Sequence, residues 1–374
     1  MKLGIILPGG VDRGGEERVI PVFLALIERL ARAHDVHVFV FHQEARAARW
    51  TLRGAQIHNI GDGRTTARAV LAIRREHRVA PFDALQALFS GSCSLVAALA
   101  AVLIRVPYAV HIAGGELVAL DDIDYGGRRR WRSRLREAVV LRAAASVTAA
   151  SAPIMDALRD LGIPADRVPL GVDLDRWAPL APRGRTRATL RLIHVASLNR
   201  VKDQSTLLMA LALVAKQGIA FDVDIVGVDT LDGRIEGISR ELGIDDRVRF
   251  LGFRTQAALR PFLAAADLLV MSSRHEAGPL VLLEAAVVGV PAVGTAVGHF
   301  AEWAPEATLA VPVGDAAALA NGIIALANDE ARRLRIATEA QRRALAEDAD
   351  ATARAFMAQY EAMTGAGRRL GQLA

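Results

Sequence analysis

Two glutamates eight positions apart, Glu276 and Glu284, stand on either side of the segment Gly278-Pro279-Leu280. A proline is typical of a helix start, and the apolar run over 280–288 predicts that helix. The unpaired backbone N–H groups of a first helical turn, together with the helix dipole, favour an anion such as a diphosphate. Carboxylates only accept hydrogen bonds, so Glu276 in the loop can bind sugar hydroxyls and Glu284 on the helix a ribose diol. Two carboxylates with different tasks are predicted.

Each glutamate taken alone is equally consistent with a solvated surface charge, because glutamates are mostly exposed. Glu284, however, stands between Leu283 and Ala285 in an otherwise apolar helix. A charge on a mostly buried helix needs a partner. A bound ligand would supply that partner.

Short β-rich runs alternate with longer amphipathic segments along the chain. The expected strands are 3–7, 36–41, 56–60, 84–89, 108–112 and 146–149 in the first half, then 190–196, 221–226, 248–251, 267–271 and 291–294 in the second. This alternation predicts parallel sheets covered by helices on both faces, an α/β fold of two doubly wound Rossmann-like domains facing across a cleft. Ligands of such sheets bind at the carboxyl ends of the strands.

The first helix illustrates the pattern. It is expected to follow directly on the opening Gly14-Gly15-Glu16, because apolar side chains recur behind that opening at helical spacing, at Val19, Phe23, Leu26, Ile27 and Leu30. Its polar start would then face the strand ends.

With 374 residues the chain exceeds the size at which one core stops growing, about 250–300 residues, so two domains are expected. The segment 179–186 holds two prolines and a glycine without periodicity, which is typical of a linker. We therefore expect an N-terminal domain over 1–178 and a C-terminal domain over 183–349. The last segment, 350–374, is expected to be helical and to pack back on the first domain.

The spacing of Glu276 and Glu284, with Gly289-Val290-Pro291 and the segment 298–302 behind them, resembles the signature of glycosyltransferase family 4. Further landmarks similar to that family are Gly14-Gly15-Glu16-Glu17-Arg18, Gly171-Val172-Asp173, the loop 197–203 and Gly252-Phe253-Arg254. The resemblance covers nearly the whole chain. It implies the twin-Rossmann GT-B fold, a nucleoside-diphosphate sugar donor, retention of anomeric configuration, and no cofactor or obligatory metal.

The resemblance also implies roles for single residues. Lys202 would neutralise the donor diphosphate, and His111, before Ala113-Gly114-Gly115-Glu116, would lie near the transferred sugar. Donor-binding positions would also include Gly14, Gly15, Ser197, Arg200 and Arg254, besides Glu276, Gly278, Pro279, Leu280 and Glu284.

Each of these roles has a plain structural alternative. Lys202 can be an exposed lysine at a helix start, Gly14-Gly15 a simple turn, and His111 a buried structural histidine. The family has an arginine where this chain has Ser197. Whether Arg200 in the same loop replaces it stays open.

Three Asp-x-Asp patterns, at Asp122, Asp173 and Asp222, raise the question of a metal, because hard cations prefer carboxylate oxygens. They share no common context, so no metal is expected. Nucleic acid is disfavoured as well, since aromatic residues make up 5% of the chain and no basic stretch is interleaved with them.

A basic segment, Arg128-Arg129-Arg130-Trp131-Arg132-Ser133-Arg134-Leu135-Arg136, carries much of the positive charge. The net charge is +5, and all of this excess lies within residues 1–179. Trp131, Leu135 and Val139 share one helical face, as in helices that rest on anionic membranes. A solvated face beside an ordinary core stripe fits equally well. Membrane contact would suit a glycolipid or lipid-linked acceptor.

Composition favours a cytoplasmic enzyme, peripheral on the inner face of the membrane if the basic segment binds lipid. The single cysteine, Cys93, excludes an internal disulfide and suits a reducing compartment. The apolar runs 3–7 and 95–104 are too short for a signal peptide and a membrane span, respectively.

The expected reaction is sugar transfer from the nucleotide to an acceptor hydroxyl, in the synthesis of cell-surface polysaccharide, lipopolysaccharide or glycolipid. Two alternatives stay open: a nucleotide-sugar epimerase on the same fold, and an inactive nucleotide-sugar-binding protein, to which the Ser197 departure points. A dehydrogenase is disfavoured, because Gly9-Gly10 and Gly14-Gly15 do not fit G-x-G-x-x-G.

Overall fold

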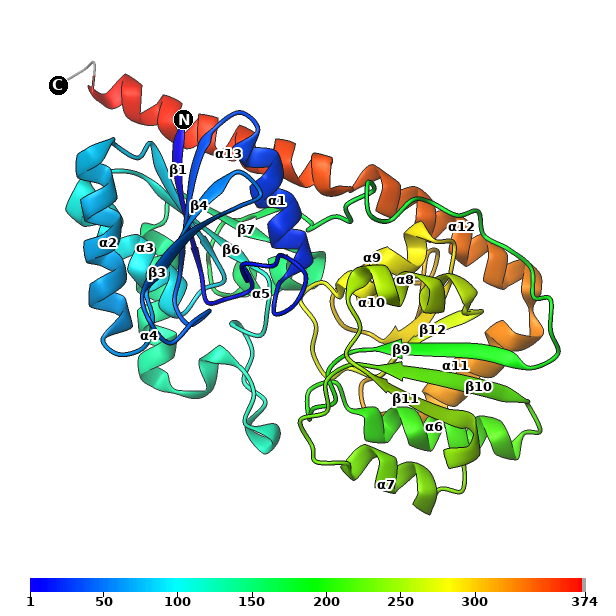
Figure 1. The fold of residues 1–374 in the computed structure, drawn as a ribbon. Helices are drawn as coiled ribbons and strands as arrows, with labels where there is room; N and C mark the ends of the chain where they lie inside the picture. Colours follow the sequence, from blue (N-terminus) through cyan, green and yellow to red (C-terminus); the bar gives the residue numbers. More distant parts are fainter. Residues whose placement is uncertain (372–374) are drawn as a thin grey trace. The chain divides into compact units, whose positions relative to one another are not determined.

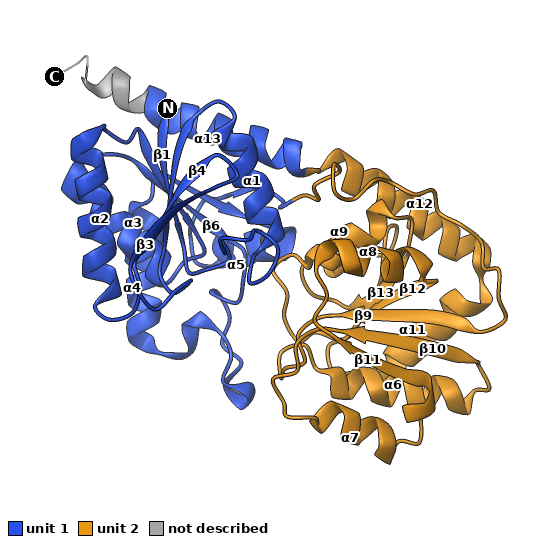
Figure 2. Ribbon diagram, in the orientation of Figure 1, with its two compact units in different colours: residues 1–170, 349–374 blue, residues 171–348 orange. Residues whose placement is uncertain are grey.

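Two mostly parallel sheets organise the chain, and each is the centre of one unit (Figures 1 and 2). The computed structural model describes the backbone of residues 1–371 and the side chains of residues 1–365. Unit 1 comprises residues 1–170 and the segment from residue 349 onward, and unit 2 comprises residues 171–348. The protein is therefore an α/β protein with two doubly wound units.

Unit 1 contains a sheet of eight strands in the order β3-β4-β2-β1-β5-β6-β7-β8. The strands are β1 (Lys2–Leu7), β2 (Asp35–Val40), β3 (Ala48–Leu52), β4 (Ala55–Asn59), β5 (Ala84–Leu88), β6 (Tyr108–Ile112), β7 (Ser146–Ala149) and β8 (Asp166–Arg167). The helices are α1 (Pro21–Ala31), α2 (Thr65–Val79), α3 (Ser92–Ile104), α4 (Trp131–Ala143), α5 (Ala152–Asp160) and α13 (Ala349–Gly371), with 3-10 turns η1 (Asp121–Ile123) and η2 (Gly127–Arg129). α13 packs against α1 in this unit; residues 372–374 of the expected last helix lie outside the described part.

The edge strand β3 departs from the expected all-parallel sheet. It pairs antiparallel with β4, with Leu52 opposite Ala55. The turn between them, Arg53-Gly54, has φ of 51° and 82°. Positive φ at both central residues is the geometry that joins two strands in a tight hairpin. The sequence did not predict β3, because exposed and partly buried side chains alternate along this edge strand and form no continuous apolar run.

The first helix begins later than expected, at Pro21, and Val19 does not belong to it. Val19 instead forms a β-bridge with Val11 across the loop that follows β1. Pro21 occupies the helix start, where its missing N–H costs nothing. Gly14 and Gly15 therefore lie in a loop well before the helix.

Unit 2 contains a sheet of six parallel strands in the order β11-β10-β9-β12-β13-β14. The strands are β9 (Leu190–Val195), β10 (Phe221–Val226), β11 (Val248–Gly252), β12 (Leu268–Met271), β13 (Ala292–Thr295) and β14 (Leu309–Val311). The helices are α6 (Gln204–Lys216), α7 (Arg234–Glu241), α8 (Gln256–Ala265), α9 (Leu280–Val287), α10 (His299–Trp303), α11 (Ala316–Asn328) and α12 (Glu330–Ala346), with the 3-10 turn η3 (Asp245–Arg247). The chain leaves β9 toward β10 on one side and returns through β12 on the other, so the strand order reverses between β9 and β12.

Both faces of this second sheet are buried. Leu190 and Leu192 of β9 point into one apolar cluster, and the next residue, Ile193, points into the other, which also holds most of α9. This alternation accounts for the nearly continuous apolar strands of unit 2. It also fixes α9 against the sheet and so sets the direction of the loop before it.

The segment 179–186, expected as a linker, runs along unit 2. The backbone N–H of Leu180 donates to the Val287 carbonyl at 3.1 Å, and the Arg185 guanidinium donates to the Ala327 carbonyl at 3.0 Å. The chain passes between the units at 170–171 and at 348–349. The segment 179–186 has no helical or strand periodicity, because it forms neither element and lies along the surface of unit 2.

Candidate active site

The point where the strand order of unit 2 reverses is lined by two loops, 196–203 after β9 and 272–279 after β12. Parallel strands point the same way, so both loops leave the same edge of the sheet. In open α/β sheets ligands bind at this crevice. Lys202 belongs to the first loop and Glu276 to the second.

Lys202 and Glu276 form an ion pair across these loops. The lysine Nζ lies 2.5 Å from Oε1 of the glutamate, and the two side chains are 24% and 10% exposed. Ser273 Oγ donates to the same Oε1 at 2.7 Å, and Ser272 Oγ donates to the backbone carbonyl of Lys202 at 2.9 Å. The two adjacent serines thus hold both members of the pair, and the lysine keeps enough exposure to meet an anion.

Helix α9 begins directly behind Glu276. Pro279 is the residue before the first helical residue, Leu280, and no side chain caps this end. The first N–H groups of the helix have no partner within the helix and, together with its dipole, favour an anion. Lys202 and the start of α9 thus belong to neighbouring loops at the carboxyl ends of β9 and β12.

Gly298 makes the loop of Glu276 possible. Its φ is 49°, and a Cβ built on it would lie 2.9 Å from the backbone carbonyl oxygen of Glu276. A side chain at this position would push that loop away. The sequence marked the segment 298–302 as a landmark, and the structure supplies the physical reason for its glycine.

Glu284 is buried on α9, with 8% of its surface exposed. Gln256, the first residue of α8, donates from Nε2 to Oε1 of Glu284 at 2.9 Å. Burial raises the pKa of Glu284 to about 7, and the bond from Gln256 opposes part of this rise. The partner expected for this carboxylate is therefore at least in part a glutamine of the protein itself, which sequence spacing could not reveal.

A stability measurement can detect this buried carboxyl. Because its pKa is raised to about 7 in the folded state from its ordinary value of 4.5, the folded chain binds more protons than the unfolded chain between these values. The free energy of unfolding therefore falls as pH rises from about 4.5 to about 7. We expect Glu284→Gln to remove roughly 3 kcal/mol of this dependence and to be more stable than the wild type at pH 8, but not at pH 4. Urea denaturation of both proteins at the two pH values tests it, and equal slopes would contradict it.

A buried polar chain that the sequence did not single out supports the Lys202 loop. His194 in β9 donates from Nδ1 to the Val270 carbonyl of β12 at 2.9 Å, and Gln204 Nε2 lies 3.1 Å from its Nε2. The same Gln204 amide donates to the Ser197 carbonyl at 3.1 Å. Burial lowers the pKa of His194 to about 4, so its ring is neutral and accepts through Nε2. The sequence features that could have indicated this chain are a histidine within an apolar strand, His194, and a glutamine at a helix start, Gln204.

The other donor-binding positions predicted in unit 2 are exposed side chains at the same edge of the sheet. Ser197 and Arg200 belong to the loop after β9, and Arg254 follows β11. Arg254 donates only to the neighbouring Phe253 carbonyl, at 2.9 Å. No hydrogen bond or ion pair of the Arg200 side chain is found among the described residues. Both guanidinium groups are available to an anion.

In unit 1 the predicted glycines lie in the loop after β1. Gly15 has φ of 69° and donates to the Asp12 carbonyl at 3.0 Å, while Gly14 donates to the Asp12 carboxylate at 3.3 Å. Gln43, which the sequence did not indicate, accepts from the N–H groups of Gly10 and Val11 at 2.8 and 3.0 Å. A buried amide thus shapes this loop, and Gly15 requires its glycine for conformation.

The side chain of His111 is fully buried in β6. Its Nδ1 lies 3.0 Å from the Thr148 hydroxyl, and the ring packs at 5.4 Å from Phe356 of α13. Burial lowers the pKa of His111 to about 3. These contacts favour the structural alternative for this histidine, and its place near the transferred sugar stays a prediction.

One aspartate of each Asp-x-Asp pattern pairs with an arginine. Asp124 pairs with Arg129, Asp173 lies 3.4 Å from Arg176, and Asp224 accepts from Arg249 at 2.7 Å. Within the described residues, the one group of three potential metal ligands in mutual reach consists of other side chains and lies in unit 1. That the reaction needs no metal stays a prediction.

Two family models match this chain, one on each unit. "Glycosyl transferase 4-like domain" matches residues 19–171, and "Glycosyl transferases group 1" matches residues 184–343. Among curated proteins, the putative glycosyltransferase EpsF of Bacillus subtilis is 31% identical over 57% of this chain and 57% of its own length. The putative colanic acid biosynthesis glycosyltransferase WcaL of Escherichia coli is 28% identical over 45% and 44%. The chain thus spans about half the length of the curated relatives it matches.

Solved structures share the fold across the chain. A sucrose-phosphate synthase from Thermosynechococcus elongatus has a TM-score of 0.81 at 21% identity and covers 98% of this chain and 99% of its own. HepE of Anabaena, solved with UDP-glucose, has a TM-score of 0.74 at 21% identity and covers 97% and 100%. With family models on both units and this fold, the chain belongs to the group 1 glycosyltransferases of GT-B type.

Proposed function

We propose that this protein transfers a sugar, with retention, from a nucleoside-diphosphate sugar to an acceptor hydroxyl in the synthesis of cell-surface polysaccharide, lipopolysaccharide or glycolipid. One observation carries the proposal: the Lys202–Glu276 pair lies beside the uncapped start of α9, at the edge where the strand order reverses. Cation and helix dipole suit a diphosphate, and the carboxylate suits sugar hydroxyls. In this proposal the transfer of the sugar uses neither a metal ion nor a cofactor.

In the proposed reaction the bond between the anomeric carbon and the diphosphate oxygen breaks while the acceptor oxygen bonds to that carbon. The acceptor proton passes to the departing phosphate oxygen on the same face, which keeps the configuration. Negative charge grows on the diphosphate, so Lys202 and the first N–H groups of α9 stabilise the transition state more than the ground state. Glu276 orients the sugar, and Glu284 is placed to accept from a ribose.

The names of similar proteins guide the choice of substrates. HepE was solved with UDP-glucose, and WcaL is named for colanic acid biosynthesis. We therefore take a uridine or guanosine diphosphate sugar as donor and a sugar, glycolipid or lipid-linked hydroxyl as acceptor. At these identities the choice is a starting point for the assay, because sugar specificity depends on loop shape.

The test is incubation of the purified chain with a panel of nucleotide sugars, with and without lipid-linked and oligosaccharide acceptors. Nucleoside diphosphate release and the identity of the remaining sugar nucleotide are followed together. Acceptor-dependent release with one donor supports the proposal, and product anomeric protons in NMR report retention. Formation of a stereoisomeric sugar nucleotide would establish an epimerase instead, and binding of no donor would overturn the assignment.

We further propose that unit 1 docks on an anionic membrane surface on the cytoplasmic side. Trp131, Leu135 and Val139 of α4 are 67%, 59% and 60% exposed. The neighbouring helix α3, which packs on α4, exposes Leu99, Val102 and Leu103. Arg130, Arg132, Arg134 and Arg136 surround the α4 face and are exposed. Apolar side chains ringed by arginines fit an anionic bilayer. Among the described residues no helix has the length and apolar character to cross a membrane.

Vesicle binding tests this docking surface. Burial of exposed apolar side chains contributes about 1.5–3 kcal/mol each, so Trp131→Ser combined with Leu135→Ser is expected to lower the partition coefficient on phosphatidylglycerol vesicles at least ten-fold. The matched control is Met209→Ser, an exposed apolar residue of α6 in unit 2. Cosedimentation should also fall with added salt and with neutral vesicles. Wild-type binding equal to that of the double variant would leave the face as ordinary solvated surface.

A further inference from the structure

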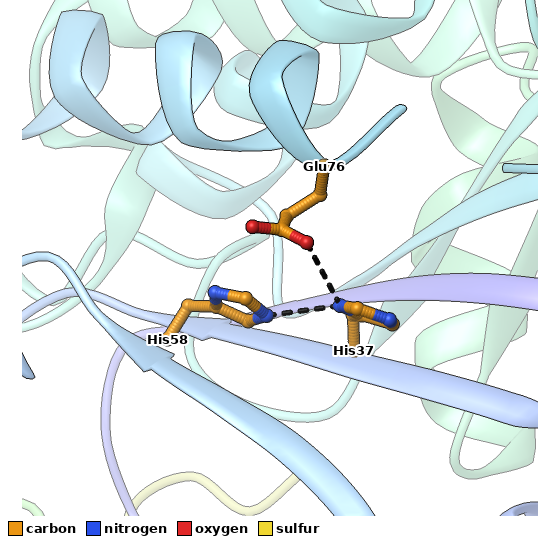
Figure 3. Close-up of side chains that lie close together, drawn as sticks. All are labelled: His37, His58 and Glu76. Atoms are coloured by element: carbon orange, nitrogen blue, oxygen red, sulfur yellow. Dashed lines mark hydrogen bonds and ion pairs between the residues drawn. The ribbon is translucent and has the colours of Figure 1, made fainter. Parts of the chain in front are cut away.

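Two histidines and a glutamate of unit 1 converge from three elements: His37 of β2, His58 of β4 and Glu76 in the last turn of α2. Nδ1 of His37 lies 2.9 Å from Nε2 of His58 and 3.9 Å from Oε2 of Glu76 (Figure 3). One ligand atom from each residue lies within 4.8 Å of the other two. Both histidines are buried, at 7% and 4% exposure. Buried imidazoles facing a carboxylate are a combination that binds metal ions.

Outer contacts orient these side chains. Asp35 accepts from Nε2 of His37 at 3.2 Å, which keeps the proton on Nε2 and leaves the lone pair of Nδ1 directed at the cluster. Arg49 lies 2.7 Å from Oε1 of Glu76, leaving Oε2 to face His37. A carboxylate behind a ligating histidine is the usual support of a metal site, since it fixes tautomer and ring orientation.

We propose that His37 Nδ1, His58 Nε2 and Glu76 Oε2 form a binding site for a divalent transition metal of the zinc class. Imidazole nitrogens favour zinc, cobalt and nickel over magnesium and calcium, which prefer oxygen ligands. The positive charges of Lys2 and Arg49 near Glu76 also disfavour cations that bind by charge alone. Tetrahedral bonds of about 2.0–2.1 Å set ligand atoms about 3.3 Å apart, which lies between the 2.9 Å from His37 Nδ1 to His58 Nε2 and the 3.9 Å from His37 Nδ1 to Glu76 Oε2. Metal binding therefore requires the two rings to separate slightly and Glu76 to approach them.

The proton between the two rings has a place to go. Without a metal, His58 Nε2–H donates to His37 Nδ1, and Nδ1 of His58 is buried with no hydrogen-bond partner among the described side chains. Metal binding requires a lone pair on Nε2, so this proton moves to Nδ1 of the same ring. Both rings stay neutral in this shift, because the proton only changes its nitrogen within the His58 ring.

A pocket borders the cluster at His58. It has a volume of about 420 Å³ and is lined by His58, Arg49 and Asn59, together with residues of α2. In this proposal the ion, and a water for the fourth coordination position, enter from this pocket. Because the ligands come from β2, β4 and α2, the metal would fasten the edge of the first sheet to its covering helix and stabilise the folded state by mass action.

The test uses untagged, chelator-treated full-length protein titrated with Co²⁺, whose visible absorption is intense in tetrahedral sites. We expect one Co²⁺ per chain, displaced by Zn²⁺ but not by Mg²⁺, and a higher thermal unfolding midpoint with Zn²⁺. His58→Gln and Glu76→Gln should each weaken binding at least ten-fold. His42→Gln, which changes an exposed histidine, is the matched control.

Each outcome decides the proposal. The absence of a tetrahedral cobalt spectrum in the wild type would overturn it and leave a hydrogen-bonded histidine pair. Equal binding by the Glu76→Gln variant, or loss of binding in His42→Gln, would overturn it as well. Far-UV circular dichroism shows whether each variant is folded, and the wild-type titration decides the question even where a variant is not.

Discussion

Replacement of Glu276 by glutamine is expected to lower kcat/KM for sugar transfer by about 10²–10³-fold. The substitution keeps the size of the side chain and an acceptor oxygen for Ser273, but it removes the charge that pairs with Lys202 at 2.5 Å. A neutral amide accepts more weakly from sugar hydroxyls, and it leaves the lysine to bind the diphosphate without a counter-charge. The loss should therefore fall mainly on kcat, with donor affinity retained or increased.

Steady-state kinetics and donor titration of the same preparation separate these effects. Glu241→Gln, on the exposed side of α7 in unit 2, is a matched control that changes charge equally without touching the loops of the site. Activity of Glu276→Gln within a factor of three of that of the control would remove Glu276 from the site. Circular dichroism and the urea midpoint establish that the variant is folded.

Replacement of Lys202 by methionine is expected to cost about 10²–10³-fold in kcat/KM and to weaken binding of the free nucleoside diphosphate. Lysine is rare in this chain, with three copies against 43 arginines, and this one stands beside the uncapped start of α9. Arginine at this position should recover only part of the activity, because its planar guanidinium is bulkier than the compact ammonium that pairs with Glu276.

Arg200→Met, in the same loop, resolves the question raised by Ser197. If Arg200 replaces the family arginine, the Arg200→Met variant should bind the nucleoside diphosphate at least ten-fold more weakly. The affinity of this variant should also depend less on salt than that of the wild type. An effect below two-fold would assign the phosphate to Lys202 and the helix start alone. A Lys202→Met variant with normal diphosphate affinity would contradict the proposed phosphate site altogether.

Most strands could be predicted from the sequence, because buried parallel strands are short apolar runs. Those around Tyr108 and Phe221 have the bounds expected. β3 escaped because an edge strand exposes alternate side chains, and only the Arg53-Gly54 turn marked it. The start of α1 was misplaced because Val19 keeps helical spacing with Phe23, yet it pairs with Val11 across a loop. The spacing of apolar residues cannot reveal a β-bridge between two positions on either side of a loop, such as Val11 and Val19.

The sequence allowed us to predict where the candidate site residues lie along the fold, but not how they pair. Spacing placed Lys202 and Glu276 at strand ends, but their contact depends on β9 and β12 being neighbours, which follows from sheet order. The partner of Glu284 is Gln256, 28 residues away, and no pattern links the two. The contact of His111 with Phe356 of α13 also joins segments far apart in the sequence, which no local pattern indicates. A one-residue difference in a strand decides which face a side chain occupies.

The two crossings of the chain between the units have a consequence for synthesis on the ribosome. Because α13 belongs to unit 1 but begins at Ala349, every residue of unit 2 emerges before this helix can pack on α1 and bring its Phe356 against His111. Domains generally fold as units as the chain is made. The whole sequence of unit 2 is therefore made first, and unit 1 keeps an apolar surface uncovered until α13 has been made. A holding chaperone would be expected to recognise that surface.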